Sequence, residues 1–174
     1  MPQELVYLGI VMGVSGCGKT TVGTSLADSL GVSFHDGDDF HSEANKAKMS
    51  SGTPLNDDDR EPWLQSIVDF AEIQCQSGNT LIVACSALRK KYRDHLRKLS
   101  FPVRFIHLHA PFEVIHERMK QREGHYMPES LLRSQFDTLE SPAGEPGVIE
   151  VSMEQSVEDA VSQSIELLGI SAED

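Results

Sequence analysis

The chain has 174 residues, of which 39 % are hydrophobic, so its length suits one compact domain (1–174) with a sizeable core. Its formal net charge of −12 argues against a nucleic-acid-binding or membrane-binding surface. Cys17, Cys75 and Cys85 lack a C-x-x-C spacing, so we expect reduced thiols and a cytoplasmic location. The first residues carry neither a basic segment nor an apolar span of about 18 residues, so we expect no secretion signal and no membrane anchor.

The first element is an apolar run at 5–12, which predicts a buried parallel strand. A complete G-x-x-x-x-G-K-[ST] pattern follows it at 13–20. Glycines in such a loop let backbone N–H groups turn toward a phosphate, and the next helix presents its first amides to the same anion. The loop predicts binding of a nucleoside triphosphate, with a ligand-free glycine-rich turn as the alternative. The expected nucleotide-binding residues are Gly13, Val14, Ser15, Gly16, Cys17, Gly18, Lys19, Thr20 and Thr21.

Two side chains of this loop have specific expected roles. Lys19 can reach the β- and γ-phosphates, which makes it a catalytic candidate. The Thr20 hydroxyl can be a ligand of Mg²⁺. Cys17 occupies a variable loop position, and we assign it no catalytic role.

Strands and helices alternate along the rest of the chain. After the helix at 19–30, which Gly31 ends, we expect strands at 32–35, 80–85, 103–109 and 148–151. The intervening helices are expected from Ser42 to about 51, from Asn56 to about 77 with Pro62 in the first turn, and at 88–99, from Pro111, at 128–139 and at 157–168. This order predicts an α/β fold in which helices cover both faces of a five-stranded parallel sheet. A ligand is expected at the carboxyl ends of the strands.

An acidic stretch ends the second predicted strand, on the same sheet edge as the phosphate loop. Of Asp36, Asp38 and Asp39, one carboxylate can hold Mg²⁺ and another can orient or deprotonate an acceptor hydroxyl. An acidic turn with a helix cap is the alternative. His41 follows three residues after Asp38 and either points into the same cleft or packs in the core.

Arginines supply the cations that phosphoryl transfer needs. Arg118 and Arg122 lie four residues apart before a break at Gly124, a pattern that suits a hinge and a lid that closes over the phosphates, although a solvated helix face is the alternative. Arginines at strand ends can also bind a substrate carboxylate through two hydrogen bonds, and Arg60, Arg89 and Arg93 are the candidates.

Two histidines share one face of the fourth predicted strand. The spacing of His107 and His109 could suit a metal ion, but the sequence offers no third ligand. We therefore favour a structural role for both.

Several motifs in fixed order closely resemble the gluconate kinases over residues 6–168. They are the loop at 12–21, D-G-D-D-F-H at 36–41, P-L-N-D-D-D-R at 54–60 with P-W-L at 62–64, A-C-S-A-L-R-K-K-Y-R-D at 84–94, R-E-G-H-Y-M at 122–127 and L-R-S-Q-F-D-T-L-E at 132–140. The sequence departs little from the family pattern: Cys17 and Thr20 stand where serine is more frequent, and Arg89 stands where lysine is common.

The resemblance implies ATP-dependent phosphorylation of D-gluconate at its 6-hydroxyl, in a three-layer P-loop kinase fold similar to shikimate and nucleoside monophosphate kinases. It implies a mobile lid at about 122–130, a homodimer, and Mg²⁺ as the metal. It places Arg118 near adenine and Arg122 in the lid as a catalytic cation, with Asp36 facing magnesium and Asp38 facing the acceptor. The residues that it places near the sugar acid are His41, Arg60, Arg89, Arg93 and Gln135.

The sequence argues against two alternatives to a gluconate kinase. A nucleotide-dependent switch that reads guanine would need an N-K-x-D motif, and the Asn45-Lys46 pair lacks the aspartate. Shikimate kinase is the other, but the resemblance to that family stops at the loop and the paired aspartates.

Overall fold

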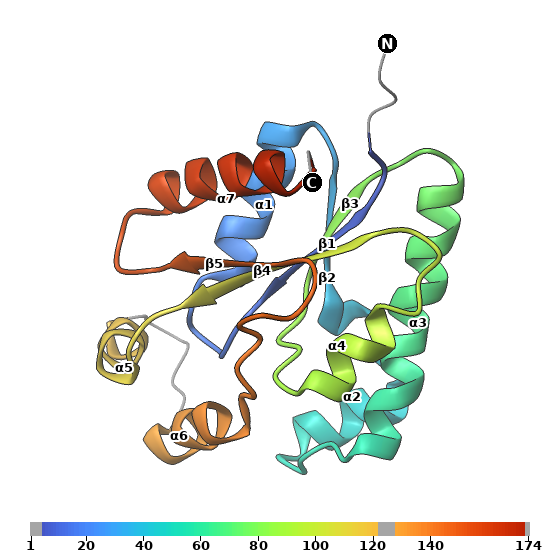
Figure 1. Cartoon of the computed structure of the whole chain (residues 1–174). Coiled ribbons are helices and arrows are strands. Elements are labelled where there is room, and N and C mark those ends of the chain that lie inside the picture. The colour runs from blue at the N-terminus through green and yellow to red at the C-terminus, as the bar shows by residue number, and fades with distance from the viewer. Residues whose placement is uncertain (1–4, 122–127, 173–174) are drawn as a thin grey trace.

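The structure is a computed structural model that describes residues 5–121 and 128–172. Its strands are β1 (Leu8–Met12), β2 (Ser33–Asp36), β3 (Leu81–Ala84), β4 (Val103–His109) and β5 (Val148–Ser152). Its helices are α1 (Lys19–Leu30), the 3₁₀ helix η1 (Gly37–Phe40), α2 (Glu43–Ser50), α3 (Asp57–Gln76), α4 (Lys90–Leu96), α5 (Phe112–Lys120), α6 (Glu129–Thr138) and α7 (Val157–Ala172). Figure 1 shows their arrangement.

The five strands form one parallel sheet in the order β2-β3-β1-β4-β5. The central strand β1 pairs with β3 on one side, where Val11 lies opposite Ala84, and with β4 on the other, where Met12 lies opposite His107. The chain therefore leaves β1 at the point where the strand order reverses, which is where open parallel sheets bind ligands, beyond the carboxyl ends of their strands. The predicted sheet is confirmed, and the phosphate loop lies at this point.

Alternate residues of the strands build two cores, one on each face of the sheet. Ile10 of β1 packs with α3 and α4, whereas Val11 packs with α1 and α7. Figure 1 shows α1 and α7 on one side of the sheet and α3 and α4 on the other. Burial on both faces explains why β1 is apolar throughout instead of alternating.

Three predicted helix ends are confirmed by their caps. Gly31 ends α1 with a φ of 70°, and the Ser42 side chain accepts a hydrogen bond from the Asn45 amide at the start of α2. Asn56 and Asp59 form a reciprocal capping box at the start of α3. Pro62 was expected in the first turn of that helix, and this was wrong: α3 begins at Asp57, so Pro62 lies in the second turn and removes one helical hydrogen bond.

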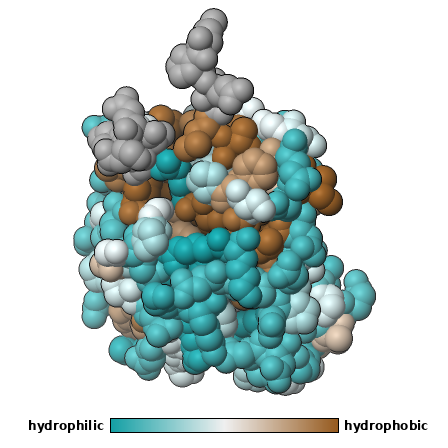
Figure 2. All heavy atoms as spheres, turned by 45° about the vertical axis from the view of Figure 1, so that its right-hand side comes forward, coloured by the Kyte–Doolittle hydropathy of each residue, from teal (hydrophilic) through white to brown (hydrophobic). Residues whose placement is uncertain are grey.

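The amino ends of the strands form the edge of the sheet away from the phosphate loop. Apolar side chains gather at one end of the molecule, above a hydrophilic face (Figure 2). Leu5, just before β1, is 43 % exposed and lines a hollow with Gln74, from the end of α3. Within the described residues, no helix has the length and apolar character needed to cross a membrane.

Candidate active site

The phosphate loop, residues 13–20, leaves β1 and runs into α1. Gly13 has a φ of 147°, and a Cβ atom there would lie 2.6 Å from the Leu108 carbonyl oxygen of β4. Gly18 caps α1 with a φ of 101°. The strand β4 therefore packs so closely on the loop that its first position requires glycine.

Lys19 is held against the loop itself. Its Nζ donates to the carbonyl oxygens of Gly13 at 2.8 Å and Val14 at 3.0 Å. The adjoining Thr20 and Thr21 are exposed in the first turn of α1. The loop therefore places an ammonium group, a hydroxyl pair and the amides of a helix N-terminus in one region, which is the chemistry that binds a nucleotide phosphate chain with Mg²⁺.

The acidic stretch lies at the carboxyl end of β2, as expected. Asp36 caps η1 by accepting a hydrogen bond from the Asp38 amide at 2.9 Å. Neighbouring protein atoms partly desolvate the Asp38 carboxyl, and together with the charges of Asp36 and Asp39 they raise its pKa, although its side chain remains 79 % exposed. The positive charge of Lys19 opposes this shift.

A single tryptophan holds η1 in place. Trp63 of α3 donates its Nε1–H to the Gly37 carbonyl oxygen at 2.7 Å, and its ring stacks on His41 with centroids 4.2 Å apart. Gly37 itself has no room for a side chain, because a Cβ atom would lie 2.4 Å from the Ala84 carbonyl oxygen. These contacts fix the backbone that carries Asp38, and they place His41 Nε2 3.9 Å from Asp38 Oδ1.

Arg60 joins the first turns of α3 and α4. Its Nη1 donates to the Tyr92 hydroxyl at 2.9 Å, and the guanidinium lies over the Tyr92 ring. The Tyr92 hydroxyl donates in turn to Asp57 at 2.7 Å, and Lys91 pairs with the same carboxylate. Arg60 is thus fixed on one side, while Arg89 lies at the N-terminal cap of α4.

Arg89 borders a hollow near the carboxyl edge. This cavity has a volume of about 560 Å³ and lies between the start of α4 and the end of α6. Its lining is strongly charged: Arg89, Lys90, Lys91, Asp94, Asp137, Thr138 and Glu140. The three basic and three acidic side chains of this lining suit a polar ligand better than an apolar one.

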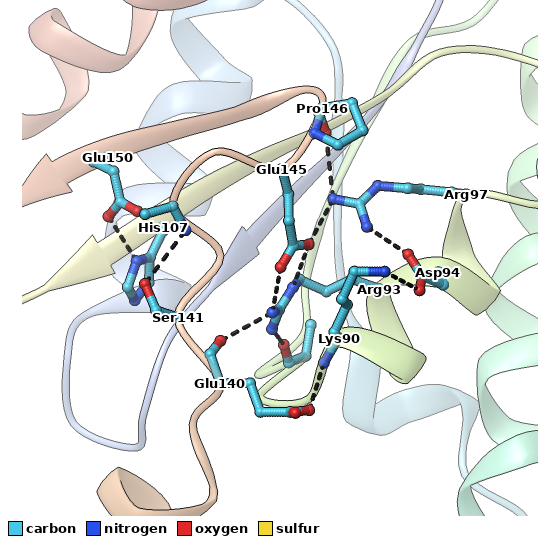
Figure 3. A network of polar contacts seen from close by, with 12 residues as sticks. Lys90, Arg93, Asp94, Arg97, His107, Glu140, Ser141, Glu145, Pro146 and Glu150 are labelled. Carbon is cyan, nitrogen blue, oxygen red and sulfur yellow. Dashed lines mark hydrogen bonds and ion pairs between the residues drawn. The ribbon is translucent and has the colours of Figure 1, made fainter.

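Arg93 was expected near the substrate, but the structure places it in the protein interior. The residue is 0 % exposed, and its guanidinium bonds both carboxylate oxygens of Glu145 and the carbonyl oxygens of Ala87 and Glu140. Figure 3 shows this network, with Arg97 bridging Glu145 and Asp94. Arg93 ties α4 to the segment 139–147 after α6, so it is unavailable to a ligand and we remove it from the candidate substrate-binding residues.

Gln135 of α6 reaches the phosphate loop. Its Oε1 accepts from the Ser15 amide at 2.6 Å, and its Nε2 donates to the Ser15 hydroxyl at 2.9 Å. On the other side of the loop, Met119 of α5 fills the space beside Gly16. Two helices from the second half of the chain therefore border the loop at which the phosphates are expected.

The expected lid lies mostly outside the described residues. Arg122 and the rest of 122–127 belong to that part, whereas Arg118 is an exposed residue of α5. Among the described residues, no three His, Cys, Asp or Glu side chains form a metal-binding group. His107 instead pairs with Glu150 of β5 at 2.7 Å, as a structural role requires.

Sequence reasoning missed several residues that shape the site. Trp63, Tyr92 and Asn45 act through contacts with residues distant in the sequence, and the motif P-W-L at 62–64 was the one signal for Trp63. Glu145 carried no signal, because it lies in a loop rich in proline and glycine.

Comparisons with known proteins agree with this geometry. A family model described as an AAA domain matches residues 8–146. A gluconokinase of Gluconobacter oxydans is 47 % identical over 84 % of this chain and 82 % of its own length, and a thermoresistant gluconokinase of Escherichia coli is 42 % identical over 93 % of both chains. The chain belongs to the gluconokinase family.

Solved structures support the same family and fold. A gluconokinase from Sinorhizobium meliloti is 38 % identical with a TM-score of 0.81 and covers 98 % of both chains. A sugar kinase from Janibacter is 43 % identical with a TM-score of 0.88 and covers 95 % of both chains. Shikimate kinase from Aquifex aeolicus, at 17 % identity and a TM-score of 0.60 over 95 % of this chain and 98 % of that one, shares the fold alone.

Proposed function

We propose that this chain is a gluconokinase that transfers the γ-phosphoryl group of ATP to the 6-hydroxyl of D-gluconate and feeds sugar-acid catabolism. The observation that carries the proposal is that the Lys19 loop after β1 and the Asp38 carboxylate after β2 lie at the same carboxyl edge of the sheet, in a chain 42–47 % identical to the two gluconokinases described above. One edge of the sheet thus carries both the loop that binds the phosphates and the carboxylate that acts on the acceptor hydroxyl.

The loop 13–20, Thr21 and Arg118 bind ATP in this proposal. Lys19 leaves the Gly13 and Val14 carbonyl oxygens to reach the β- and γ-phosphates. The negatively charged phosphate oxygens are stronger partners for its ammonium group than two neutral carbonyl oxygens are. Thr20 and Asp36 fit a magnesium ion, since both offer oxygen ligands near the start of α1 and the end of β2. When bound, Mg²⁺ neutralises phosphate charge.

The sugar acid lies between η1 and the start of α4. Its carboxylate binds Arg60 and Arg89, and its hydroxyls bind His41 and Asp38, with Gln135 between the acceptor and the loop. Arg60 is suited to this work because Tyr92 already holds one side of its guanidinium, so little entropy is lost when it binds.

The chemical step is a direct transfer. The 6-hydroxyl oxygen attacks the γ-phosphorus and forms a new P–O bond, while the bond to the β–γ bridging oxygen breaks and its electrons leave with ADP. Asp38 takes the hydroxyl proton, and its raised pKa makes it a better base than an ordinary aspartate. Lys19 and Arg122 stabilise the charge that develops on the transferred group.

We further propose that the lid at about 122–130 closes over ATP, that the whole of 1–174 acts as one catalytic domain, and that the enzyme is a cytoplasmic homodimer. Lid closure would bring Arg122 to the phosphates and exclude water. Size-exclusion chromatography with light scattering would test the dimer.

The function is tested by ADP release, measured with a coupled assay over a panel of acceptors. We expect gluconate to exceed shikimate, glucose and nucleoside monophosphates by orders of magnitude in kcat/KM, and phosphorus NMR should show a 6-phosphate ester. Equal turnover of any other acceptor would overturn the gluconate assignment.

A further inference from the structure

The His41 ring is held rigidly at the acceptor side of the site. Its side chain is 3 % exposed, and its plane lies within 15° of the Trp63 ring on which it stacks. One ring nitrogen, Nε2, faces Asp38 Oδ1 at 3.9 Å. The protonation of the two nitrogens decides what this ring can offer a ligand at that position.

Asn45 of α2 determines which nitrogen carries the proton. Its Nδ2 lies 2.9 Å from the Asp59 carbonyl oxygen and 3.2 Å from His41 Nδ1. The carbonyl oxygen can only accept, so the atom beside it must be the amide nitrogen, and the orientation of the Asn45 amide is fixed. An amide nitrogen can only donate, so His41 Nδ1 must be the acceptor and carries no proton.

We propose that Asn45 is a positioning residue that fixes His41 as the neutral tautomer protonated on Nε2, so that His41 donates to the acceptor hydroxyl and directs the proton of that hydroxyl toward Asp38. This inference rests on the proposed acceptor site. It fixes the direction of the hydrogen bonds: Asn45 donates to His41, His41 donates to the acceptor hydroxyl, and the hydroxyl donates to Asp38.

The 3.9 Å gap supports this arrangement. It is too long for a hydrogen bond between His41 Nε2 and Asp38 Oδ1, but one hydroxyl oxygen about 2.8 Å from both atoms would bridge them. A bridging hydroxyl that accepts from Nε2–H has its own proton left for the carboxylate. The hydroxyl is thereby aligned for loss of its proton to Asp38 as it attacks phosphorus.

The surroundings favour the neutral form of the imidazole. Burial is the main cause of the lowered His41 pKa, and the charges of Arg60 and Lys46 lower it further. Asp38, on η1, is the carboxylate that faces the ring, and it lies on the Nε2 side.

Nitrogen-15 NMR of the uniformly labelled protein tests the tautomer directly, with the His41 signals assigned by their loss in His41→Gln. Near neutral pH, we expect a pyridine-like shift for Nδ1 and a pyrrole-like shift for Nε2. A proton on Nδ1, or an imidazolium at that pH, would overturn the proposal. This readout does not depend on the substrate, so it stands apart from the acceptor panel that tests the proposed function.

Asn45 variants test the consequence for catalysis. Asn45→Ala should leave a mixture of tautomers and lower kcat about tenfold or more, with the KM for ATP unchanged. Asn45→Asp should move the proton to Nδ1 or charge the ring, which the same NMR shifts would reveal. Asn79→Ala is the matched control, because Asn79 is an exposed asparagine just before β3, at the amino end of the sheet and away from His41 and Asp38. If Asn45→Ala kept a pure Nε2–H ring and full kcat, the role assigned to Asn45 would be wrong, and the wild-type shifts decide the tautomer even if the variants fail to fold.

Discussion

Gln135 and Ser15 pair through two hydrogen bonds across 120 residues of sequence. The Gln135 carboxamide accepts from the Ser15 amide and donates to the Ser15 hydroxyl, so both ends of one side chain are bound to one residue of the phosphate loop. The loop conformation and the position of α6 therefore depend on each other. A change at the phosphates can reach α6 and, through the segment 139–147, the start of α4.

Replacing Gln135 tests this coupling. Gln135→Ala removes both bonds and should lower kcat/KM for gluconate about tenfold, since α6 no longer follows the loop. Gln135→Glu keeps the acceptor for the Ser15 amide but adds negative charge near the phosphates, so it should raise the KM for ATP more than the alanine variant does. The control is Gln76→Ala, because Gln76 is exposed at the end of α3 and bonds to Glu72 of the same helix. Steady-state kinetics with both substrates varied would show the pattern, and equal effects of all three changes would contradict it.

Lys19 is expected to serve catalysis more than folding. Lys19→Ala should lower kcat at least about a hundredfold, because it removes the ammonium group that the loop holds for the charge on the transferred phosphoryl group. Its melting temperature should stay within about 4 °C of the wild type, since Lys19 lies at the start of α1 and belongs to neither hydrophobic core. Lys98→Ala, at an exposed lysine after α4, should change neither quantity. Retained turnover in Lys19→Ala would refute the proposed phosphate site.

Arg93 should control stability. Arg93→Ala leaves Glu145, whose carboxylate is only 10 % exposed, without its main partner, and we expect a loss of about 3–5 kcal/mol in the free energy of unfolding. Arg133→Ala breaks an exposed pair with Glu129 and should cost less than about 1 kcal/mol. Urea unfolding curves give both values. Similar costs for the two variants would show that the Arg93 pair is not the buried clamp that the geometry indicates.

The same clamp predicts a pH dependence. Hydrogen bonds from Arg93 and then Arg97 lower the pKa of Glu145 below its usual value of 4.5, although burial acts in the opposite direction. A depressed folded-state pKa adds stability above the unfolded-state value, and this part is lost as the pH falls through the folded-state value. In Glu145→Gln, the acid-induced loss of stability should therefore be smaller than in the wild type below about pH 4.5.

Replacing Asp38 should lower the activity of the protein and raise its stability. Its raised pKa places the acid limb of kcat/KM above the pH expected for an ordinary aspartate, and Asp38→Asn should remove that limb together with most of kcat. Because folding raises this pKa, ionised Asp38 costs stability, and the cost grows as the pH rises past the unfolded-state value. Asp38→Asn should thus be more stable than the wild type at pH 7, while Asp39→Asn, one residue along, should retain the acid limb. A normal limb in Asp38→Asn would exclude Asp38 as the base.

Most of the fold could be predicted because its signals are local. The apolar strand at 103–109 and the helix at 19–30 match β4 and α1 residue for residue, since caps and burial patterns lie within each element. The helix predicted at 88–99 is shorter in the structure, where α4 spans Lys90–Leu96, because a run of basic residues says little about where a helix stops. The glycine-lysine pattern at 13–20 located the phosphate loop, and the aspartates that follow the second strand located the acidic stretch.

The partners of individual side chains could not be predicted. Arg93 looked like a substrate ligand because it follows a strand in a basic helix, but its carboxylate partner comes from 52 residues away. The position of Asn45 beside His41 depends on the packing of α2 against the start of α3, which no pattern within α2 encodes. The sequence reveals which residue types are present at a site, whereas tertiary packing decides which of them remain free to bind.

Trp63 has a practical consequence beyond the support of η1. It is the single tryptophan in the chain, and its indole stacks on His41 while its N–H bonds the backbone beside Asp38. The tryptophan fluorescence of the protein therefore comes from one ring, beside the proposed acceptor position. This ring is a built-in optical reporter that can follow acceptor binding in stopped flow without any added label.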